Sequence, residues 1–504
     1  RVDPRDIPDQ TDQFAPRLGF AYDPFSNGKT VIRGFGGIYY ARTPLLTIAG
    51  PINNFRTPPG DVTLQVSGFD DTRTGGVITR TACANNIPAA DPRCPNTIYK
   101  QFLSIGVDLN QFPLNALPIL TAAQVQQINA NIAAARGFTV NPNAGLSLTA
   151  VGDQFENPRS VQFGGGFEHE LARGLTVGAT FDYVNTVHLN RNRDLNVPVP
   201  VIRAGDMSQR PFYNVDAGGN NRPARGLNFI QIREASARSL YRAFTVRAQL
   251  RRSFGQFDAF YTLAKNLDDD STERSATFAE YDDSFNLQPE YNFSRLDRKH
   301  QFVFNTVINA PLGFQISSQG RFRSGLPLDA TVSGIVAPAD FVTMANSNNR
   351  NAAYAAVVTV NSTFPCSGQA TILCASTSGD LNGDRGNFSD RPYSAPGVPS
   401  LRNSFRNRPF YNVDMRFQRD FKFNERYTLS PTFEVFNVFK FDNIEYAGTT
   451  AFNYGNPGVN ERTGEILGPT NRTFLQLRDS NGNYLLNNRP GSPLQMQLGL
   501  RFLF

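Results

Sequence analysis

The last residues of the chain constrain its fold more than any other segment. From Pro493 to Phe504, apolar side chains recur at every second position. These residues are Leu494, Met496, Leu498, Leu500, Phe502 and Phe504. Gln, Gly and Arg occupy most of the positions between them, so an extended strand here has one apolar and one polar face. The sequence then stops on the aromatic residue. This pattern is typical of a transmembrane β-barrel strand, with lipid against its apolar face and water against its polar face.

Bulk composition argues against a helical membrane protein and leaves a barrel open. The chain has 504 residues, of which 40% are hydrophobic, and it includes 42 Phe and 17 Tyr. No apolar run approaches the ~20 residues that a membrane-spanning helix needs. A barrel strand needs apolar side chains only at alternate positions, so a mean hydropathy of −0.35 is compatible with a barrel.

The net charge of +6 does not indicate a nucleic-acid partner. Arginines are spread through the chain and interleaved with Asp and Glu, and we find no basic stripe or known binding motif. We therefore expect no nucleic acid among the partners, and we interpret the mixed charge as a hydrated lumen and loop surface.

Amphipathic strands recur in pairs along the sequence. The expected pairs are 14–23 with 30–40, 160–171 with 175–189, 240–254 with 257–267, 298–310 with 314–325, and 410–421 with 427–439. Within a pair, the connection is a turn of about two to six residues, rich in Gly, Pro or Asn. Between pairs the connections are far longer, and residues 41–157 and 327–408 are the longest. Short periplasmic turns and long extracellular loops are typical of outer-membrane barrels.

The loop at 41–157 is expected to contain a short surface helix. Thr121 and Gln124 have the spacing of a capping box, and residues 122–136 favour a helix before Gly137 ends it. We find no support for a catalytic role of this segment.

We expect an all-β fold, a transmembrane antiparallel barrel of which this chain is the C-terminal half. The sequence contains about eleven strands, and the first and the last both run toward the periplasm. Bacterial single-chain barrels have an even number of strands. An open barrel would leave backbone groups unpaired in lipid, at a cost of several kcal/mol each. We therefore expect the remaining strands elsewhere in the full protein.

Several short sequence segments, which we call phrases, together carry a family resemblance because they occur in a particular order along the chain. They are FAPRLGFAYDP from Phe14, GKTVIRG from Gly28, YTLAKNLDD from Tyr261, LDRKHQF from Leu296, SGLP from Ser324, GDRGNFSDRP from Gly383, NVDMR from Asn412 and FEVFNVF from Phe433. With the terminal phenylalanine, they resemble the C-terminal part of the barrel domain of TonB-dependent outer-membrane receptors of the Oar-like type. The resemblance covers the strands and skips most of the long loops.

This resemblance implies a barrel of about 22 strands that is closed by an N-terminal plug and driven by an inner-membrane motor. The plug and the segment that contacts the motor are absent from this sequence. The implied partners are outer-membrane lipid, the TonB motor complex through the missing N-terminal region, the barrel-assembly machinery, and an unknown extracellular ligand. In this family the assembly machinery reads a terminal aromatic strand, a role that would fall on Leu498, Leu500, Phe502 and Phe504.

The function that the resemblance implies is uptake of a bulky ligand, captured by the loops and admitted when the motor displaces the plug. The alternative is a surface interaction or adhesion protein that uses the barrel as a platform. A soluble all-β glycan-binding protein fits the composition, but not the terminal phenylalanine or the asymmetry of the turns. The cargo is not specified: siderophores, glycans, peptides and vitamins all suit such a barrel.

Charged residues at polar positions of the expected strands are candidates for the lumen. They are Glu168, Glu170, Asp182, Arg247, Arg251, Arg321, Arg323, Asp414, Arg416, Asp420, Glu434 and Arg501. They could hold a plug by ion pairs or guide a polar solute. Simple hydration of the lumen face is the alternative, since the alternation demands polar residues there in any case.

The four cysteines form two local pairs in expected loops. Cys83 lies near Cys94, and Cys366 lies near Cys374. Disulfides made in an oxidising compartment suit such pairs. Zinc is the alternative, but the three histidines, His169, His188 and His300, are scattered along the sequence.

A second metal-site candidate is a calcium loop. Asp380, Asn382 and Asp384 place oxygen-bearing side chains at alternate positions before Gly386. The glycine is misplaced for an EF-hand and a distal Glu is missing, so an Asx-rich turn is the alternative.

No catalytic constellation is evident, and we expect no enzymatic activity. The scattered histidines make no credible Ser/His/Asp or Cys/His set. The glycine-rich stretches at 34–37 and 164–166 precede no helix, so we interpret them as points of close backbone approach within strands.

Overall fold

The computed structural model describes most of the expected strands and part of the connections between them. The described residues are 10–42, 71–74, 77–80, 105–107, 111, 121, 123–124, 127–128, 146–152, 154–202, 209–213, 215, 222–225, 227–271, 281–330, 382, 384, 390–391, 393–395, 397–423, 426–446, 475 and 490–504. All statements about the structure below concern these residues.

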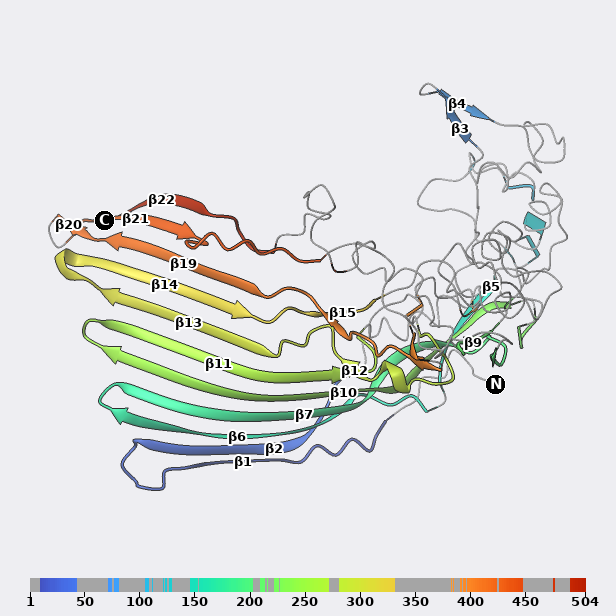
Figure 1. Ribbon diagram of the computed structural model, residues 1–504, viewed down its shortest axis with the longest axis horizontal. Helices are drawn as coiled ribbons and strands as arrows, with labels where there is room; N and C mark the ends of the chain where they lie inside the picture. Colours follow the sequence, from blue (N-terminus) through green and yellow to red (C-terminus); the bar gives the residue numbers. More distant parts are fainter. Residues whose placement is uncertain are drawn as a thin grey trace, which may run out of the picture.

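One large antiparallel wall dominates the molecule (Figure 1). Its strands, in chain order and in spatial order, are β1 (Arg17–Tyr22), β2 (Thr30–Tyr40), β6 (Arg159–Ala172), β7 (Leu175–Asp194), β10 (Leu227–Arg252), β11 (Gly255–Asp268), β13 (His300–Asn309), β14 (Phe314–Arg323), β19 (Phe410–Arg419), β21 (Thr428–Phe436) and β22 (Gln495–Leu503). Each strand pairs with its neighbours along the chain, as expected of an up-and-down barrel wall. The predicted antiparallel β-barrel architecture is confirmed.

Smaller elements lie mostly beyond the wall. The strands β5 (Leu146–Val151), β12 (Asn292–Phe293) and β20 (Phe421–Lys422) join the main sheet, and β5 is parallel to β10. Two-stranded sheets are formed by β3 (Asp71–Thr74) with β4 (Val77–Arg80), β8 (Val201–Ile202) with β9 (Pro211–Phe212), β15 (Pro327–Leu328) with β18 (Phe405–Arg406), and β16 (Tyr393–Ala395) with β17 (Val398–Pro399). Two 3₁₀ turns are η3 (Gln288–Glu290) and η4 (Pro311–Gly313). Within the described residues, no helix has the length and apolar character needed to cross a membrane.

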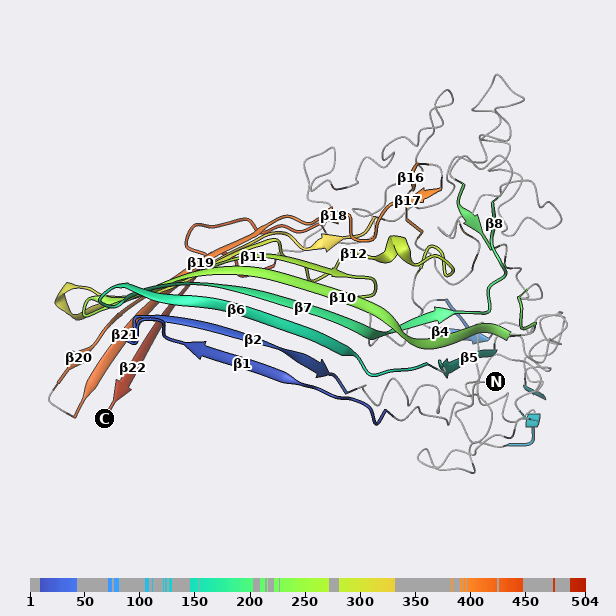
Figure 2. The same ribbon diagram turned by 90° about the horizontal axis from the view of Figure 1, so that it is seen from below.

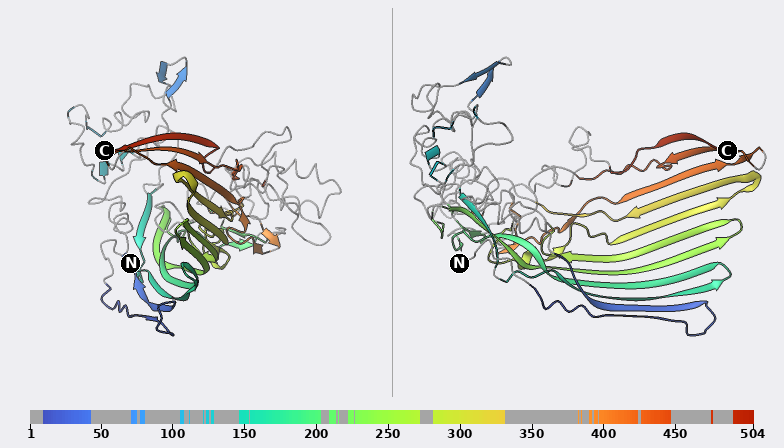
Figure 3. Two further views of the ribbon diagram at one scale, coloured as in Figure 1. Left: turned by 90° about the vertical axis from the view of Figure 1, so that its left-hand side faces the viewer. Right: turned by 180° about the vertical axis from the view of Figure 1, so that it is seen from behind.

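The two ends of the wall differ as the sequence predicts. At one end tight turns connect neighbouring strands, and β22 ends beside them (Figure 1). At the other end lie the small two-stranded sheets. The wall also curls, so that its strands follow an open arc when viewed along the wall (Figures 2 and 3).

The capping box predicted in the longest connection is formed. The Thr121 backbone N–H donates to Gln124 Oε1 at 2.9 Å, and the Gln124 N–H donates to Thr121 Oγ1 at 3.3 Å. Residues 123–124 and 127–128 are helical. The extent of the helix stays a prediction, because most of residues 122–136 lie outside the described part.

Strand register sorts the side chains of the wall into an apolar face and a polar face. Along one row, Phe302 lies opposite Phe322, and Phe322 opposite Tyr411. On the same face of β22, the side chains of Leu498 and Leu500 are 82% and 71% exposed. Large exposed apolar residues are expected where the surrounding medium is lipid.

Glycines on the apolar face receive aromatic rings from neighbouring strands. A Cβ on Gly34 would lie 2.5 Å from the ring of Phe20, and a Cβ on Gly320 would lie 2.0 Å from the ring of Phe304. Each ring therefore occupies space that a side chain would fill. This arrangement agrees with the close approach expected for glycines at 34–37, and it gives these weak strand formers a packing partner.

Two strands extend further than the alternation predicts. β7 continues to Asp194 and β10 begins at Leu227, whereas the predicted strands end at residue 189 and begin at residue 240. The two extensions pair with each other, with Gln231 opposite Asp194. Arg191 and Gln231 are buried there. Because buried polar residues occupy these extensions, the apolar/polar alternation that marks the rest of each strand is obscured.

We predict that Gly166→Ala weakens the folded wall by about 1–3 kcal/mol, the usual cost of forcing extra atoms into a packed site. A Cβ on Gly166 would lie 2.4 Å from the backbone oxygen of Ala179, which cannot move without disturbing the ladder. Urea unfolding of the full-length protein in lipid vesicles measures the effect.

The matched control is Gly19→Ala on the same polar face. Its Cβ would lie 3.5 Å from the backbone oxygen of Gly34, which is ordinary contact. Equal destabilisation by both substitutions would contradict the packing explanation and indicate a general intolerance of alanine in these strands.

Candidate functional site

The polar face of the wall carries the residues that the sequence assigns to the lumen. The ladders place Glu168, Glu170, Asp182, Arg247, Arg251, Arg321, Arg323, Asp414, Arg416, Glu434 and Arg501 on this one face. Asp420 follows β19, and its Oδ1 accepts a hydrogen bond of 2.9 Å from Gln418, which belongs to the same face. Contact of this face with a water-filled lumen stays a prediction.

Two ion pairs that share one carboxylate form a charge cluster on the polar face. Glu168 Oε1 lies 2.8 Å from Arg33 Nη1 and 2.5 Å from Arg247 Nη2. Glu168 and Arg247 belong to β6 and β10, and their side chains meet across Gly178 of the intervening β7. A Cβ on Gly178 would lie only 3.2–3.3 Å from both side chains. The glycine therefore makes room for an ion pair that ties strands that are not neighbours.

A second and larger group of charges lies where the long connections meet. We call it the outer ion-pair cluster. It comprises the pairs Arg191–Asp269, Arg210–Asp282, Arg222–Asp194, Arg391–Glu290 and Arg402–Asp268. The pairs are buried or nearly so, in contrast to those of the polar face.

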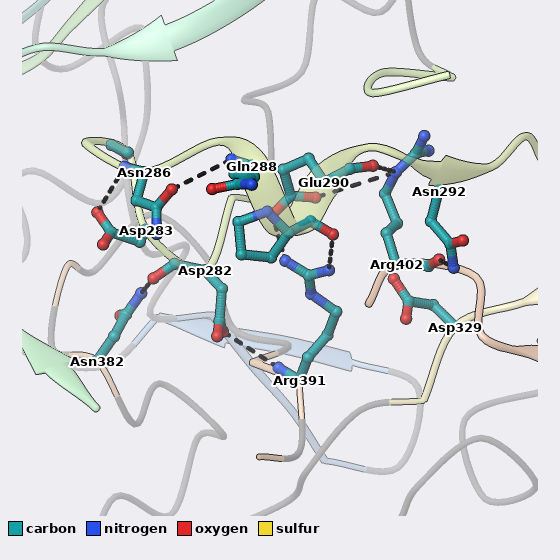
Figure 4. A network of polar contacts seen from close by, with 12 residues as sticks. Asp282, Asp283, Asn286, Gln288, Glu290, Asn292, Asp329, Asn382, Arg391 and Arg402 are labelled. Carbon is teal, nitrogen blue, oxygen red and sulfur yellow. Dashed lines mark hydrogen bonds and ion pairs between the residues drawn. The ribbon is translucent and has the colours of Figure 1, made fainter. Parts of the chain in front are cut away.

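Glu290, at the end of η3, is the centre of one half of the cluster (Figure 4). Its carboxylate is ion-paired with Arg391, and its backbone oxygen accepts a hydrogen bond of 2.9 Å from Arg402 Nε. Arg402 also forms an ion pair with Asp268 at the end of β11. The two arginines therefore attach the connections after β11 and β14 to each other and to the wall.

Asp282 is the centre of the other half. Its Oδ1 accepts hydrogen bonds from Arg210 Nη1 at 3.0 Å and from the Arg391 backbone N–H at 3.2 Å. The side-chain amide of Asn382 donates to the Asp282 backbone oxygen at 3.0 Å, and the Asn382 backbone oxygen accepts from Tyr213 at 2.7 Å. Three long connections thus converge on one carboxylate and its backbone.

A cavity of about 260 Å³ lies against this half of the cluster. Asp282, Asp283, Glu290, Arg391 and Tyr393 are among its lining residues. Three carboxylates, one guanidinium and a phenol therefore meet in a space that could hold a small polar group. It is a candidate for ligand contact among the described connections.

Burial shifts the titration of the groups around the cavity. Loss of water around Glu290 raises its pKa from 4.5 to about 7, while Arg391 opposes the shift. Burial also raises the pKa of Tyr213, and the neighbouring Asp283 adds to it. The pKa of Asp329 is raised by burial as well, against the influence of Arg391. In this region the ionised forms of the buried carboxyl groups are therefore stabilised by arginine rather than by water.

The calcium prediction is tested only in part by the geometry. Asp384 donates its backbone N–H to Asn382 Oδ1 at 3.1 Å, which is an Asx turn. Asp380 lies outside the described residues, and no group of three or more His, Cys, Asp or Glu residues suited to a metal occurs within them. A calcium site stays a prediction. Cys83, Cys94, Cys366 and Cys374 also lie outside the described residues, so the disulfides stay predictions.

The residues expected to signal barrel assembly gather on the apolar face of β22 and at its end. Leu498, Leu500 and Phe502 lie opposite Phe433, Pro431 and Leu429 of β21. The ring of Phe504 stacks beside Phe502 at a centroid distance of 6.1 Å. Their recognition by the assembly machinery stays a prediction.

The outer ion-pair cluster was not foreseen from the sequence. Two acidic runs, at 268–270 and 282–283, were the available signal, since adjacent carboxylates in a loop call for cationic partners. Their arginine partners are remote: Glu290 and Arg391 are 101 residues apart, and Asp268 and Arg402 are 134 apart. No local pattern links residues at such separations.

Arg391→Gln is expected to loosen the cluster strongly. It removes the nearer ion-pair partner of the buried Glu290 carboxylate and leaves only Arg402, whose Nε lies 4.0 Å from Glu290 Oε2. Removing one partner of a buried pair costs about 3–5 kcal/mol. Faster amide hydrogen exchange at residues 281–293 in the full-length protein measures the effect.

The matched control is Arg408→Gln, an exposed arginine with no ion pair among the described residues. The double variant Arg391→Gln/Glu290→Gln should recover part of the protection; equal exchange in the single and double variants would contradict the pairing.

The same segment should be more stable at low pH. Glu290 has its pKa raised from 4.5 to about 7 in the folded cluster, so between these values the unfolded segment releases a proton that the folded one keeps. Its stabilising contribution is complete below pH 4.5 and is lost as the pH rises through about 7. Hydrogen exchange at residues 281–293, corrected for intrinsic rates, should slow from pH 8 to pH 5.5. Glu290→Gln should abolish this slope, and a slope that persists in the variant would assign it to another group.

Comparison with protein families agrees with the architecture. A family model described as "Outer membrane beta barrel domain" matches residues 2–474. The sequence matches no curated protein. Similar solved structures are the outer membrane transporter YddB from Escherichia coli (8% identity, TM-score 0.39, 90% of this chain and 39% of that chain) and the FrpB iron transporter from Neisseria meningitidis (9%, 0.36, 97% and 39%). A mutant of the ferric enterobactin receptor PfeA from Pseudomonas aeruginosa, in complex with enterobactin, is also similar (8%, 0.39, 97% and 40%).

This chain spans about two fifths of the length of these three structures. The family match, in contrast, covers most of the chain and agrees with the antiparallel wall and its apolar face. The chain therefore belongs to the outer membrane β-barrel domain family and is a transmembrane antiparallel barrel of the outer membrane.

Proposed function

We propose that the chain is part of a TonB-dependent receptor, of the Oar-like type, that imports a bulky ligand across the outer membrane. The observation that carries the proposal is that one structure combines two features. The wall has a charged polar face, and the long connections at one of its ends, which we call the loop layer, are held together by the buried pairs of the outer ion-pair cluster. A wall that served only to anchor the protein would need neither feature.

The polar face suits the contact with a plug. Glu168 is bound by Arg33 and Arg247, and Glu434 lies 3.8 Å from Arg416. Such surface pairs are individually weak, in the range of about 0–1 kcal/mol, and can exchange partners at little cost. A plug that must move in and out of a barrel requires contacts of this strength rather than an apolar interface.

The loop layer suits the capture of a ligand. The outer ion-pair cluster fixes three long connections relative to one another, so the cavity beside Asp282 and Asp283 is formed before a ligand arrives. Prior order of this kind lowers the entropic cost of binding. The charged and phenolic lining favours a polar cargo over a purely apolar one.

The test is energy-dependent uptake by cells that produce the full-length protein. Three labelled probes, a ferric siderophore, an oligosaccharide and an oligopeptide, are offered with and without an uncoupler. One of them should accumulate in energised cells. Accumulation should be lost when the segment that contacts the motor is deleted, although the protein remains in the membrane.

Loop variants separate capture from transport. Asp283→Asn changes the cavity lining without removing an ion pair of the outer cluster, and it should weaken surface binding of the accumulated probe. The control Arg408→Gln should not. Binding without uptake in every condition would overturn the importer and favour the platform that presents its loops to a surface partner.

A further inference from the structure

A second cavity opens on the apolar face of the wall. It has a volume of about 460 Å³ and is lined by residues of β7, β10, β11, β12, β18 and the segment before β13. Arg242 and Lys265 supply cations on the apolar face, while Phe244, Leu263 and Phe293 supply the apolar surface.

The cavity cations are unusual because they lie among lipid-facing residues. Arg242 is paired across the ladder with Lys265, and Phe244 with Leu263 in the next position of the same face. Phe244 and Leu263 are 45% and 42% exposed, so this face is open to the surroundings. A cation on the lipid face is costly at the bilayer midplane and nearly free of cost near an interface.

The position along β10 places the cations at such an interface. Arg242 precedes Arg252, the last residue before the turn, by ten positions. At about 3.3 Å per residue and a strand tilt of about 40°, this separation spans about 25 Å of membrane depth, the height of the apolar band of a barrel. The apolar-face residues between them, Phe244, Val246, Ala248 and Leu250, carry no charge. Arg242 and Lys265 therefore mark the outer edge of the band, on the side of the long connections.

Among the described residues, the two apolar-face cations have no acidic partner. Arg406, another basic residue of the cavity, is neutralised by Asp297 at 2.5 Å. Arg242 and Lys265, in contrast, form no ion pair in the part of the chain that the structure describes. Lys265 Nζ lies 5.7 Å from the ring centroid of Phe293, and Arg242 lies 5.7 Å from that of Tyr183, which positions both charges without neutralising them. Elsewhere on the wall, Arg33 and Arg247 share the carboxylate of Glu168.

We propose that this cavity binds the phosphorylated headgroup of an outer-leaflet lipid. The unpaired cations of Arg242 and Lys265 receive the phosphates, and the acyl chains extend down the apolar face along Phe244 and Leu263. Charge complementarity and depth both select this ligand, because the site joins a basic rim to an apolar floor at the level of lipid headgroups. The inference is independent of what the barrel transports.

The test is binding of lipid A by the full-length protein in a zwitterionic detergent, measured by native mass spectrometry and titration. Neutralising two cations near a membrane surface, at about 1 kcal/mol each, should weaken binding by about 30-fold in R242Q/K265Q. The charge-preserving variant R242K/K265R should bind within a few-fold of the wild type. Heat-modifiable gel migration verifies that each variant is folded.

A matched control removes the same number of charges at the opposite end of the wall. R252Q/R419Q changes two basic residues near the tight turns, and its binding of lipid A should be unaltered. Dephosphorylated lipid A should bind the wild type as weakly as lipid A binds the cavity variant. Equal losses in the cavity and control variants would overturn the site. Full displacement of lipid A by millimolar inorganic phosphate would contradict the assignment of a lipid ligand and would indicate that the cavity binds a free anion.

Discussion

The register of the wall, which shifts only near the ends of the β6–β7 and β7–β10 ladders, is the constraint on which the other features depend. Because side chains alternate strictly along a strand, a slip of one residue would exchange the apolar and polar faces of every strand beyond it. In lipid each backbone group must also be paired, so the ladder has little freedom to adjust locally. The charges around Glu168, the aromatic row from Phe302 to Tyr411 and the cations beside Phe244 all inherit their positions from this one alignment.

The sequence predicts the wall well because the relevant signals are local. Alternation marks the strands, and Gly, Pro and Asn mark the turns, so the bounds of β2 were predicted to the residue and most others to within a few. The extensions of β7 and β10 were missed because buried polar residues such as Arg191 and Gln231 obscure the alternation. The outer ion-pair cluster was missed for a different reason: its partners come from different connections, and only the fold brings them together.

The phrases that carry the family resemblance acquire a physical meaning in the structure. The phrase beginning at Tyr261 includes Asp268, which pairs with Arg402, and the phrase beginning at Gly383 includes Arg391, which pairs with Glu290. These residues fasten the loop layer to the wall. In this chain, two of the phrases that carry the resemblance therefore hold long connections in place, and these contacts carry little information about the cargo.

The aromatic rings that lie over glycines have a consequence for the lipid itself. The ring of Phe20 lies over Gly34, and the ring of Phe304 lies over Gly320. At these places the ring fills the space left by the missing glycine side chain, so the surface is more even than the side-chain sizes suggest. Acyl chains pack best against a surface without voids, since each gap forfeits dispersion contacts. Phenylalanine and glycine differ greatly in size, so their side-by-side placement predicts an uneven surface. In the folded wall the lipid-facing surface is comparatively smooth. Neighbouring lipids can slide along such a surface with little change in contact energy, except at the basic rim, where a headgroup would be retained.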